Sequence, residues 1–154
     1  MPRKAPAFWE RADWRSHLLL PASYVTMAGA RLRQRLVTPE RAGVPVFCAG
    51  NLVAGGAGKT PLALALAAGL KAEGKTPYFL SRGYGGLLKG PLLVNPALHT
   101  AADVGDEPLL LAEAVPTVVA RDRAAGARFA VAQGADALLL DDGFQNPSLH
   151  KDLS

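Results

Sequence analysis

A glycine-rich turn with the sequence GGAGKT, residues 55–60, lies between an apolar run and a helix-forming run. The apolar run, residues 44–49, is typical of a short buried strand, and residues 60–73 favour a helix that ends at Gly74. Glycines let backbone N–H groups turn toward one anion, and the following helix adds its positive N-terminal end. The strand, turn and helix together predict a phosphate-binding loop.

Two polar side chains of this turn suit a nucleotide. Lys59 can reach the terminal phosphates of a nucleoside triphosphate, and the Thr60 hydroxyl can bind Mg²⁺. The strict pattern G-x-x-x-x-G-K-[ST] requires glycine at position 53, where this chain has Val53, so the turn is a variant of that pattern. The alternative is an ordinary glycine-rich turn with an incidental lysine.

A second acidic element follows the apolar run of residues 137–140, where Asp141 and Asp142 stand next to each other. In proteins with a phosphate-binding loop, a carboxylate at the end of a neighbouring strand holds Mg²⁺, directly or through water. Adjacent side chains on a strand point to opposite faces, so we expect the two carboxylates to differ in role. Taken alone, such a sequence after a strand is usually just a turn.

Strands and helices alternate along the chain after residue 41. Apolar runs at residues 76–80, 116–120 and 137–140 predict strands, and residues 109–114 and 121–133 predict helices. The strands are continuous apolar runs, which is typical of a parallel sheet buried on both faces. We therefore expect an α/β fold of the P-loop NTPase type over residues 42–154, with a mostly parallel sheet flanked by helices.

The basic character of the chain lies in residues 1–41, which contain eight Lys or Arg against three acids. No charged residue occurs between Arg15 and Arg31, and apolar residues recur there at helical spacing. This stretch is shorter than the roughly 20 residues needed to span a bilayer. We expect residues 1–41 to form a basic amphipathic helix lying on a membrane surface. The alternative is an amphipathic helix packed on its own domain.

Several other polar residues have two interpretations each. Asp106 and Glu107 precede a predicted helix, where they suit helix capping, but a carboxylate there could also act as base for a hydroxyl nucleophile. Arg82, Arg121 and Arg123 are candidate phosphate contacts or solvated charges. One cysteine and three scattered histidines exclude a disulfide framework and a Cys-based zinc site.

Five ordered motifs resemble the tetraacyldisaccharide 4′-kinase family, the lipid A 4′-kinases of Gram-negative bacteria. They are AGNLVAGGAGKTP at 49–61, SRGYGG at 81–86, GDEPLLLA at 105–112, RDR at 121–123 and LDDGFQ at 140–145. The resemblance implies transfer of the γ-phosphate of ATP, with Mg²⁺, to the 4′-hydroxyl of tetraacyldisaccharide 1-phosphate, which gives lipid IV-A. It also implies a peripheral enzyme on the cytoplasmic face of the inner membrane, bound through its N-terminal helix.

The same resemblance implies roles for individual residues. Asp106 would accept the proton of the sugar hydroxyl, and Lys59 would neutralise the γ-phosphate. Thr60, Asp141 and Asp142 would organise Mg²⁺, with Glu107 assisting. The nucleotide loop would consist of Val53, Ala54, Gly55, Gly56, Ala57, Gly58, Lys59 and Thr60.

Two features depart from the family pattern. The family usually has histidine after LDDGFQ-type sequences, where this chain has Asn146, which cannot titrate near neutrality. Family members are also about twice as long, so we expect this chain to be a fragment that lacks the second half of the family's fold.

Two other function classes remain open. A P-loop NTPase switch or partner-binding module without a lipid acceptor would share the GKT and LDD motifs but explains the N-terminal segment and GDEP less easily. A nucleic-acid binder ranks last, because the positive charge lies beside an apolar, Trp-containing stripe. We expect neither a nucleic-acid partner nor a protein partner.

Overall fold

The computed structural model describes Tyr24, Gly29 and residues 37–49, 59–141 and 146–153. Contacts divide the chain into two compact units, residues 1–38 and 39–154. In the first unit Tyr24 and Gly29 are helical and exposed, and the rest of the predicted amphipathic helix lies outside the described residues. Among the helices that are described, none has the length and apolar character to cross a bilayer.

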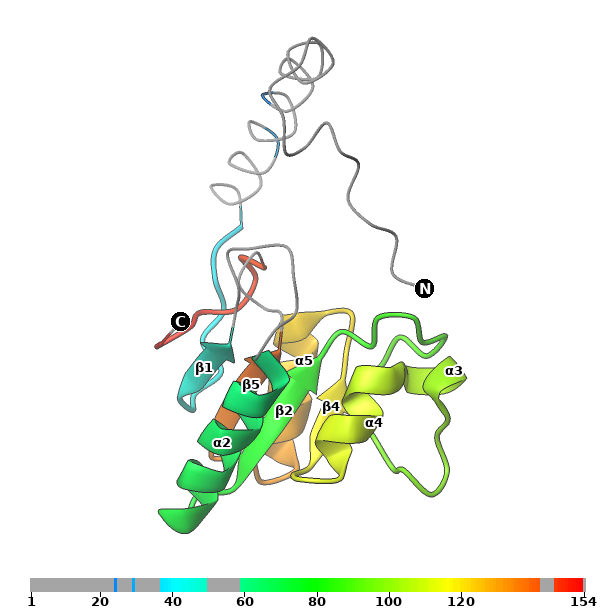
Figure 1. The fold of residues 1–154 in the computed structure, drawn as a ribbon. Helices are drawn as coiled ribbons and strands as arrows, with labels where there is room; N and C mark the ends of the chain where they lie inside the picture. The colour runs from blue at the N-terminus through cyan, green and yellow to red at the C-terminus, as the bar shows by residue number, and fades with distance from the viewer. Residues whose placement is uncertain (1–23, 25–28, 30–36, 50–58, 142–145, 154) are drawn as a thin grey trace, which may run out of the picture. The chain divides into compact units, whose positions relative to one another are not determined.

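The second unit is built on a five-stranded mixed sheet (Figure 1). Its strands are β1 (Val46–Ala49), β2 (Pro77–Ser81), β3 (Leu92–Leu93), β4 (Thr117–Val119) and β5 (Ala137–Asp141). Their order in the sheet is β1-β5-β2-β4-β3. The first four run parallel, and β3 pairs antiparallel with β4 at one edge. The predicted mostly parallel α/β sheet is confirmed.

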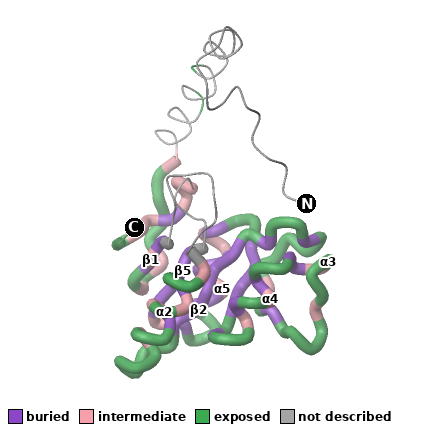
Figure 2. The backbone as a smooth tube through the Cα atoms, in the orientation of Figure 1, coloured by how far each residue is buried: buried purple, intermediate pink, exposed green. Residues whose placement is uncertain are grey.

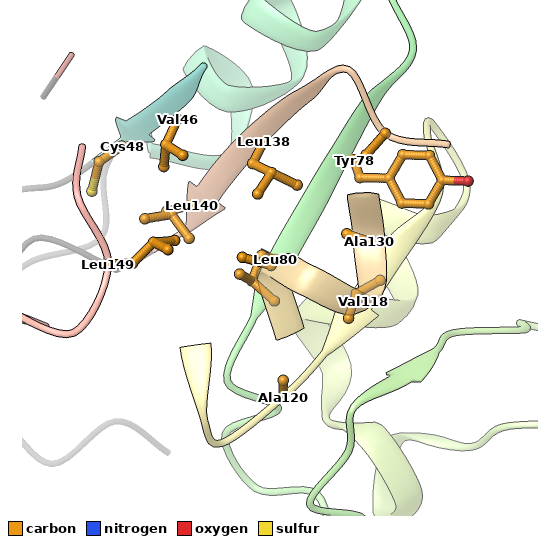
Figure 3. Close-up of a cluster of buried hydrophobic side chains, with 12 residues drawn as sticks. Val46, Cys48, Tyr78, Leu80, Val118, Ala120, Ala130, Leu138, Leu140 and Leu149 are labelled. Carbon is orange, nitrogen blue, oxygen red and sulfur yellow. The ribbon is translucent and has the colours of Figure 1, made fainter. Parts of the chain in front are cut away.

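Helices cover both faces of this sheet, with α2 and α4 on one side and α5 on the other (Figure 1). The helices are α2 (Lys59–Ala72), α3 (Ala101–Val104), α4 (Asp106–Ala112) and α5 (Arg123–Ala132). Strand side chains alternate between the two faces. Phe79 and Leu139 face α2 and α4, whereas Leu80 and Leu140 belong to the cluster packed against α5 (Figure 3).

The helix α4, which opens with the DEP sequence, begins earlier than predicted. It starts at Asp106 rather than at residue 109 and ends at Ala112. Pro108 is compatible with this start because the N–H groups of a first helical turn have no intrahelical partner. The short helix α3 was not predicted at all, although Thr100 and Asp103 provide a capping pair for it.

The start of the second unit is tied to the C-terminal segment. Glu40 N–H donates to Ser148 O at 3.0 Å, and His150 N–H donates to Glu40 O at 2.9 Å. Further along, Cys48 N–H donates to Leu153 O at 2.9 Å, at the free edge of β1. Residues 148–150 therefore lie beside Glu40 and residues 152–153 beside β1, and Glu40 is held within the second unit.

Candidate functional site

The predicted motifs follow the carboxyl ends of four parallel strands. The phosphate-binding turn follows β1, the SRGYGG loop begins in β2, the RDR sequence follows β4, and LDDGFQ begins in β5. Parallel strands place their carboxyl ends at one edge of a sheet, which is where open α/β folds bind ligands. The sheet topology thus brings sequences up to ninety residues apart to one edge.

The register between β1 and β5 places the strand before the phosphate-binding turn beside the strand that ends in Asp141. Ala49, the last residue of β1, is the strand partner of Asp141, the last residue of β5. The helix α2 begins at Lys59 and packs on these strands, and Thr60 in its first turn is half-buried. Residues 50–58 and 142–145 lie outside the described residues, so Val53, Ala54, Gly55, Gly56, Ala57, Gly58 and Asp142 are not placed.

The GDEP turn is packed against the SRGYGG loop through backbone contacts. A Cβ atom on Gly105, whose φ is +91°, would lie 2.4 Å from Tyr84 O. A Cβ atom on Gly86 would lie 2.6 Å from the carbonyl carbon of Val104. Both positions require glycine, because a side chain would separate the two loops. This contact brings Asp106 next to the loop that leaves β2.

Asp106 and Glu107 occupy the first turn of α4, and both are exposed. Negative side chains in a first turn interact favourably with the helix dipole, which fits both positions. The N-cap residue is Gly105, so the acids do not cap the helix. Exposure beside the carboxyl edge of the sheet also leaves the Asp106 carboxylate accessible to a hydroxyl group from solvent. The dipole interaction and a role as base are compatible.

The three candidate arginines divide into two kinds. Arg82 directly follows β2 and Arg121 lies two residues after the end of β4, and both are exposed, as phosphate contacts or solvated charges would be. Arg123 is only 4% exposed, and its Nη1 donates to Leu80 O at 3.3 Å. The interpretation of Arg123 as a solvated charge is therefore wrong, because the guanidinium binds a buried main-chain carbonyl.

A cavity of about 410 Å³ lies elsewhere, at the amino end of β1. It is lined by Arg41, Ala42, Gly43, Val44, Pro45, His150 and Asp152. The motifs lie at the opposite end of β1, so this cavity is not part of the candidate site. Within the described ranges no group of three or more His, Cys, Asp or Glu side chains could hold a metal ion.

Comparison with known proteins assigns the chain to a family. A family model described as Tetraacyldisaccharide-1-P 4′-kinase, LpxK, matches residues 15–154. The chain belongs to the LpxK family. A tetraacyldisaccharide 4′-kinase of Bradyrhizobium sp. is 56% identical over 98% of this chain, and that of Gluconacetobacter diazotrophicus is 58% identical over 97%. These matches cover 45% and 46% of the two relatives, so the chain spans less than half of their length.

A solved LpxK structure shares the fold. The crystal structure of LpxK from Aquifex aeolicus in complex with ATP matches with a TM-score of 0.76 and 36% sequence identity. The match covers 88% of this chain and 46% of that protein. The mixed sheet with flanking helices is therefore the fold of the corresponding part of an LpxK protein.

Sequence reasoning missed the positions that join the loops of this LpxK family member. The contact of Gly86 and Gly105 with neighbouring backbone, and the burial of Arg123, depend on distant segments. The only local signals were the glycines themselves and the position of Arg123 at the start of a helix. Neither signal specifies a partner.

Proposed function

We propose that this chain is the nucleotide-binding part of a tetraacyldisaccharide 4′-kinase. Such an enzyme transfers the γ-phosphate of ATP to the 4′-hydroxyl of tetraacyldisaccharide 1-phosphate and forms lipid IV-A in lipid A biosynthesis. The observation that carries the proposal is the pairing of Ala49 with Asp141, because it puts the strand that precedes the GKT turn beside the strand that ends in Asp141. Two comparisons support the proposal: the chain belongs to the LpxK family, and the crystal structure of LpxK from Aquifex aeolicus is a complex with ATP.

The residues of the nucleotide site suit ATP and Mg²⁺ chemically. Residues 53–60 would surround the phosphates, and Lys59 would offset the negative charge of the γ-phosphate. The hydroxyl of Thr60 and the carboxylates of Asp141 and Asp142 are hard oxygen ligands of the kind that Mg²⁺ prefers, with Glu107 in an assisting role. Bound Mg²⁺ would supply positive charge to the phosphate oxygens.

Asp106 is the proposed general base. Its carboxylate would take the proton from the 4′-hydroxyl while that oxygen bonds to the γ-phosphorus and the bond to the ADP oxygen breaks. Its exposed place beside the SRGYGG loop leaves room for a bulky sugar acceptor. Phosphoryl transfer depends mainly on positioning and charge, which fits a site built from loops held at one sheet edge.

Residues 1–41 form the proposed membrane-associating segment, and residues 42–154 the kinase domain. A basic amphipathic helix on the cytoplasmic face of the inner membrane would keep the enzyme beside its acylated substrate. The acceptor could then react while its acyl chains remain in the bilayer. The protein would be peripheral, with the lipid as its partner.

The test measures transfer of labelled γ-phosphate to the acylated disaccharide, together with binding of an ATP analogue. A chimera that adds the remaining length of the Bradyrhizobium relative supplies the part of the family that this chain does not span. We expect Asp106→Asn in that chimera to reduce transfer by roughly 10²–10⁴-fold and to leave nucleotide binding unchanged.

The matched control is Asp136→Asn, an acid at the opposite end of the sheet that accepts from Thr76 N–H at 2.7 Å. Near-normal transfer by the Asp106 variant would refute its role as base. Release of free phosphate without labelled lipid would instead favour the NTPase alternative.

A further inference from the structure

Asn146 is the first described residue after the LDDGFQ sequence, and hydrogen bonds from two residues converge on it. Its side-chain Oδ1 accepts from Ser148 N–H at 2.9 Å and from the Ser148 hydroxyl at 2.7 Å. Its main-chain oxygen accepts from Lys151 Nζ at 2.8 Å. An asparagine that binds the N–H two residues ahead closes a tight turn, so the side chain of Asn146 fixes the path of the chain as it leaves this sequence.

The segment that follows this turn is anchored in the core of the second unit. Leu149 is 3% exposed and belongs to the same hydrophobic cluster as Leu140 of β5 (Figure 3). Glu40 holds this segment as well, through two main-chain hydrogen bonds. Residues 146–148 are half-buried, whereas the chain before α3 is mostly exposed (Figure 2). The turn at Asn146 therefore connects the LDDGFQ sequence to a fixed point.

The LDDGFQ sequence thus begins and ends at anchored positions. At its start, Asp141 is the strand partner of Ala49 in the register of β1 and β5. At its far end stands the turn of Asn146, only five positions further along the chain. A connection of so few residues has a short reach, so its path depends on both of its ends. A change at Asn146 is therefore expected to alter the path of the residues that follow β5.

An asparagine suits this turn better than the histidine of the family pattern. An amide oxygen has two lone pairs, and Ser148 donates two hydrogen bonds to that of Asn146. A neutral imidazole offers one acceptor nitrogen. The pair of Asn146 and Ser148 therefore closes the turn with one more hydrogen bond than a histidine could accept.

We propose that Asn146 is a positioning residue for the magnesium site. By fixing the far end of the LDDGFQ sequence, its side chain keeps the proposed ligands Asp141 and Asp142 directed toward one Mg²⁺ ion. Residues that orient metal ligands in this way change metal affinity by roughly 10–100-fold when they are mutated. This inference rests on the proposed function, because it requires Mg²⁺–ATP at this edge of the sheet. It needs the two hydrogen bonds that Oδ1 accepts, and not the amide nitrogen of Asn146.

The test measures the affinity of the full chain for a fluorescent ATP analogue, once with Mg²⁺ and once with EDTA. We expect Asn146→Ala to weaken binding roughly tenfold with Mg²⁺ and less than about twofold with EDTA. Asn146→Asp keeps both acceptor bonds, so its affinity with Mg²⁺ should stay within about threefold of that of the unaltered chain. Ser148→Ala removes only the hydroxyl donor and should lose about threefold in affinity, again with Mg²⁺ alone.

The matched control is Asn95→Ala. Asn95 Oδ1 accepts from Ala97 N–H at 2.9 Å, so this variant breaks a turn of the same kind in the exposed segment before α3. We expect its affinity for the analogue to equal that of the unaltered chain, both with Mg²⁺ and with EDTA. Circular dichroism at the temperature of the assay checks that each variant is folded.

Three results would overturn the inference. They are an unchanged Mg²⁺ dependence in Asn146→Ala, equal losses of affinity with Mg²⁺ and with EDTA, and an Asn146→Asp variant as weak as Asn146→Ala. If Asn146→Ala does not fold, Ser148→Ala decides, and an unchanged Mg²⁺ dependence in that variant counts against the inference in the same way. Failure of the proposed function is distinct. Nucleotide binding by the unaltered chain that does not respond to Mg²⁺ would contradict the magnesium site itself, and the inference would fall with it.

Discussion

Arg123 shows how one residue can join a helix to the functional edge of the sheet. Its guanidinium donates to Leu80 O at 3.3 Å, one residue before β2 ends. One turn further along α5, Gly126 approaches so closely that a Cβ atom there would lie 2.6 Å from Leu80 Cδ1. The two positions together hold the first turn of α5 against the end of β2, from which the SRGYGG loop leaves.

We expect Arg123→Met to lower the free energy of unfolding by about 1–3 kcal/mol, because the buried Leu80 carbonyl loses a charged donor. Arg123→Lys should recover part of this loss, since lysine has a donor but not the planar fork of arginine. Urea unfolding followed by circular dichroism measures the change. Arg121→Met, two residues earlier and exposed, is the control, and an equal loss in both methionine variants would contradict the role of Arg123.

At the scale of elements, the short helix α3 depends on the pair at its start. The Asp103 carboxylate accepts from the Thr100 hydroxyl at 2.7 Å and from Thr100 N–H at 2.8 Å. These hydrogen bonds lower the pKa of Asp103 below its ordinary value of 3.8, and the bond from the Thr100 hydroxyl has the largest effect. The charge of His99 acts in the same direction. The ionised carboxylate is therefore the form that stabilises α3 and the approach to Asp106.

The lowered pKa fixes the sign of a pH effect. The contribution of Asp103 is fully present above the ordinary pKa and is lost as the pH falls through the lower pKa of the folded state. We expect the unaltered chain to exceed Asp103→Asn in thermal midpoint at neutral pH, and this difference to shrink below about pH 4. Thermal unfolding across this pH range measures it. The same pattern in Glu73→Gln, at the end of α2, would show that the effect is not specific to Asp103.

Local signals explain which elements were predictable. Residues 60–73 were predicted as a helix and α2 covers Lys59–Ala72, because the helix-forming run and Gly74 are adjacent in sequence. The insertion of β5 between β1 and β2 has no local signal. The contact of Gly86 with Val104, which joins segments eighteen residues apart, has no local signal either.

The convergence of Lys59, Thr60 and the two aspartates on one magnesium ion stays a prediction, since residues 50–58 and Asp142 lie outside the described residues.

At the scale of the whole molecule, the nucleotide motifs belong to β1 and β5, the edge strand and its neighbour in the sheet, and to the start of α2. Ligand that binds only the folded state stabilises it by an amount set by its concentration relative to its dissociation constant. ATP bound between β1, β5 and α2 should therefore stabilise the entire second unit, because unfolding of these elements removes the core that they share with α5.

We expect Mg²⁺–ATP at about 100 times its dissociation constant to stabilise the chain by about 2.7 kcal/mol, or roughly 5–10 °C in thermal midpoint. Lys59→Ala should remove most of this shift, because the phosphates lose their charged partner in the loop. Lys71→Ala is the matched control, since Lys71 lies in the last turn of the same helix and donates to Ala114 O at 3.3 Å. The thermal midpoint of Lys71→Ala without nucleotide can change, but the increase in its midpoint on adding Mg²⁺–ATP should match that of the unaltered chain. A shift of equal size in the Lys59 variant would place ATP away from the GKT turn and would contradict the proposed nucleotide site.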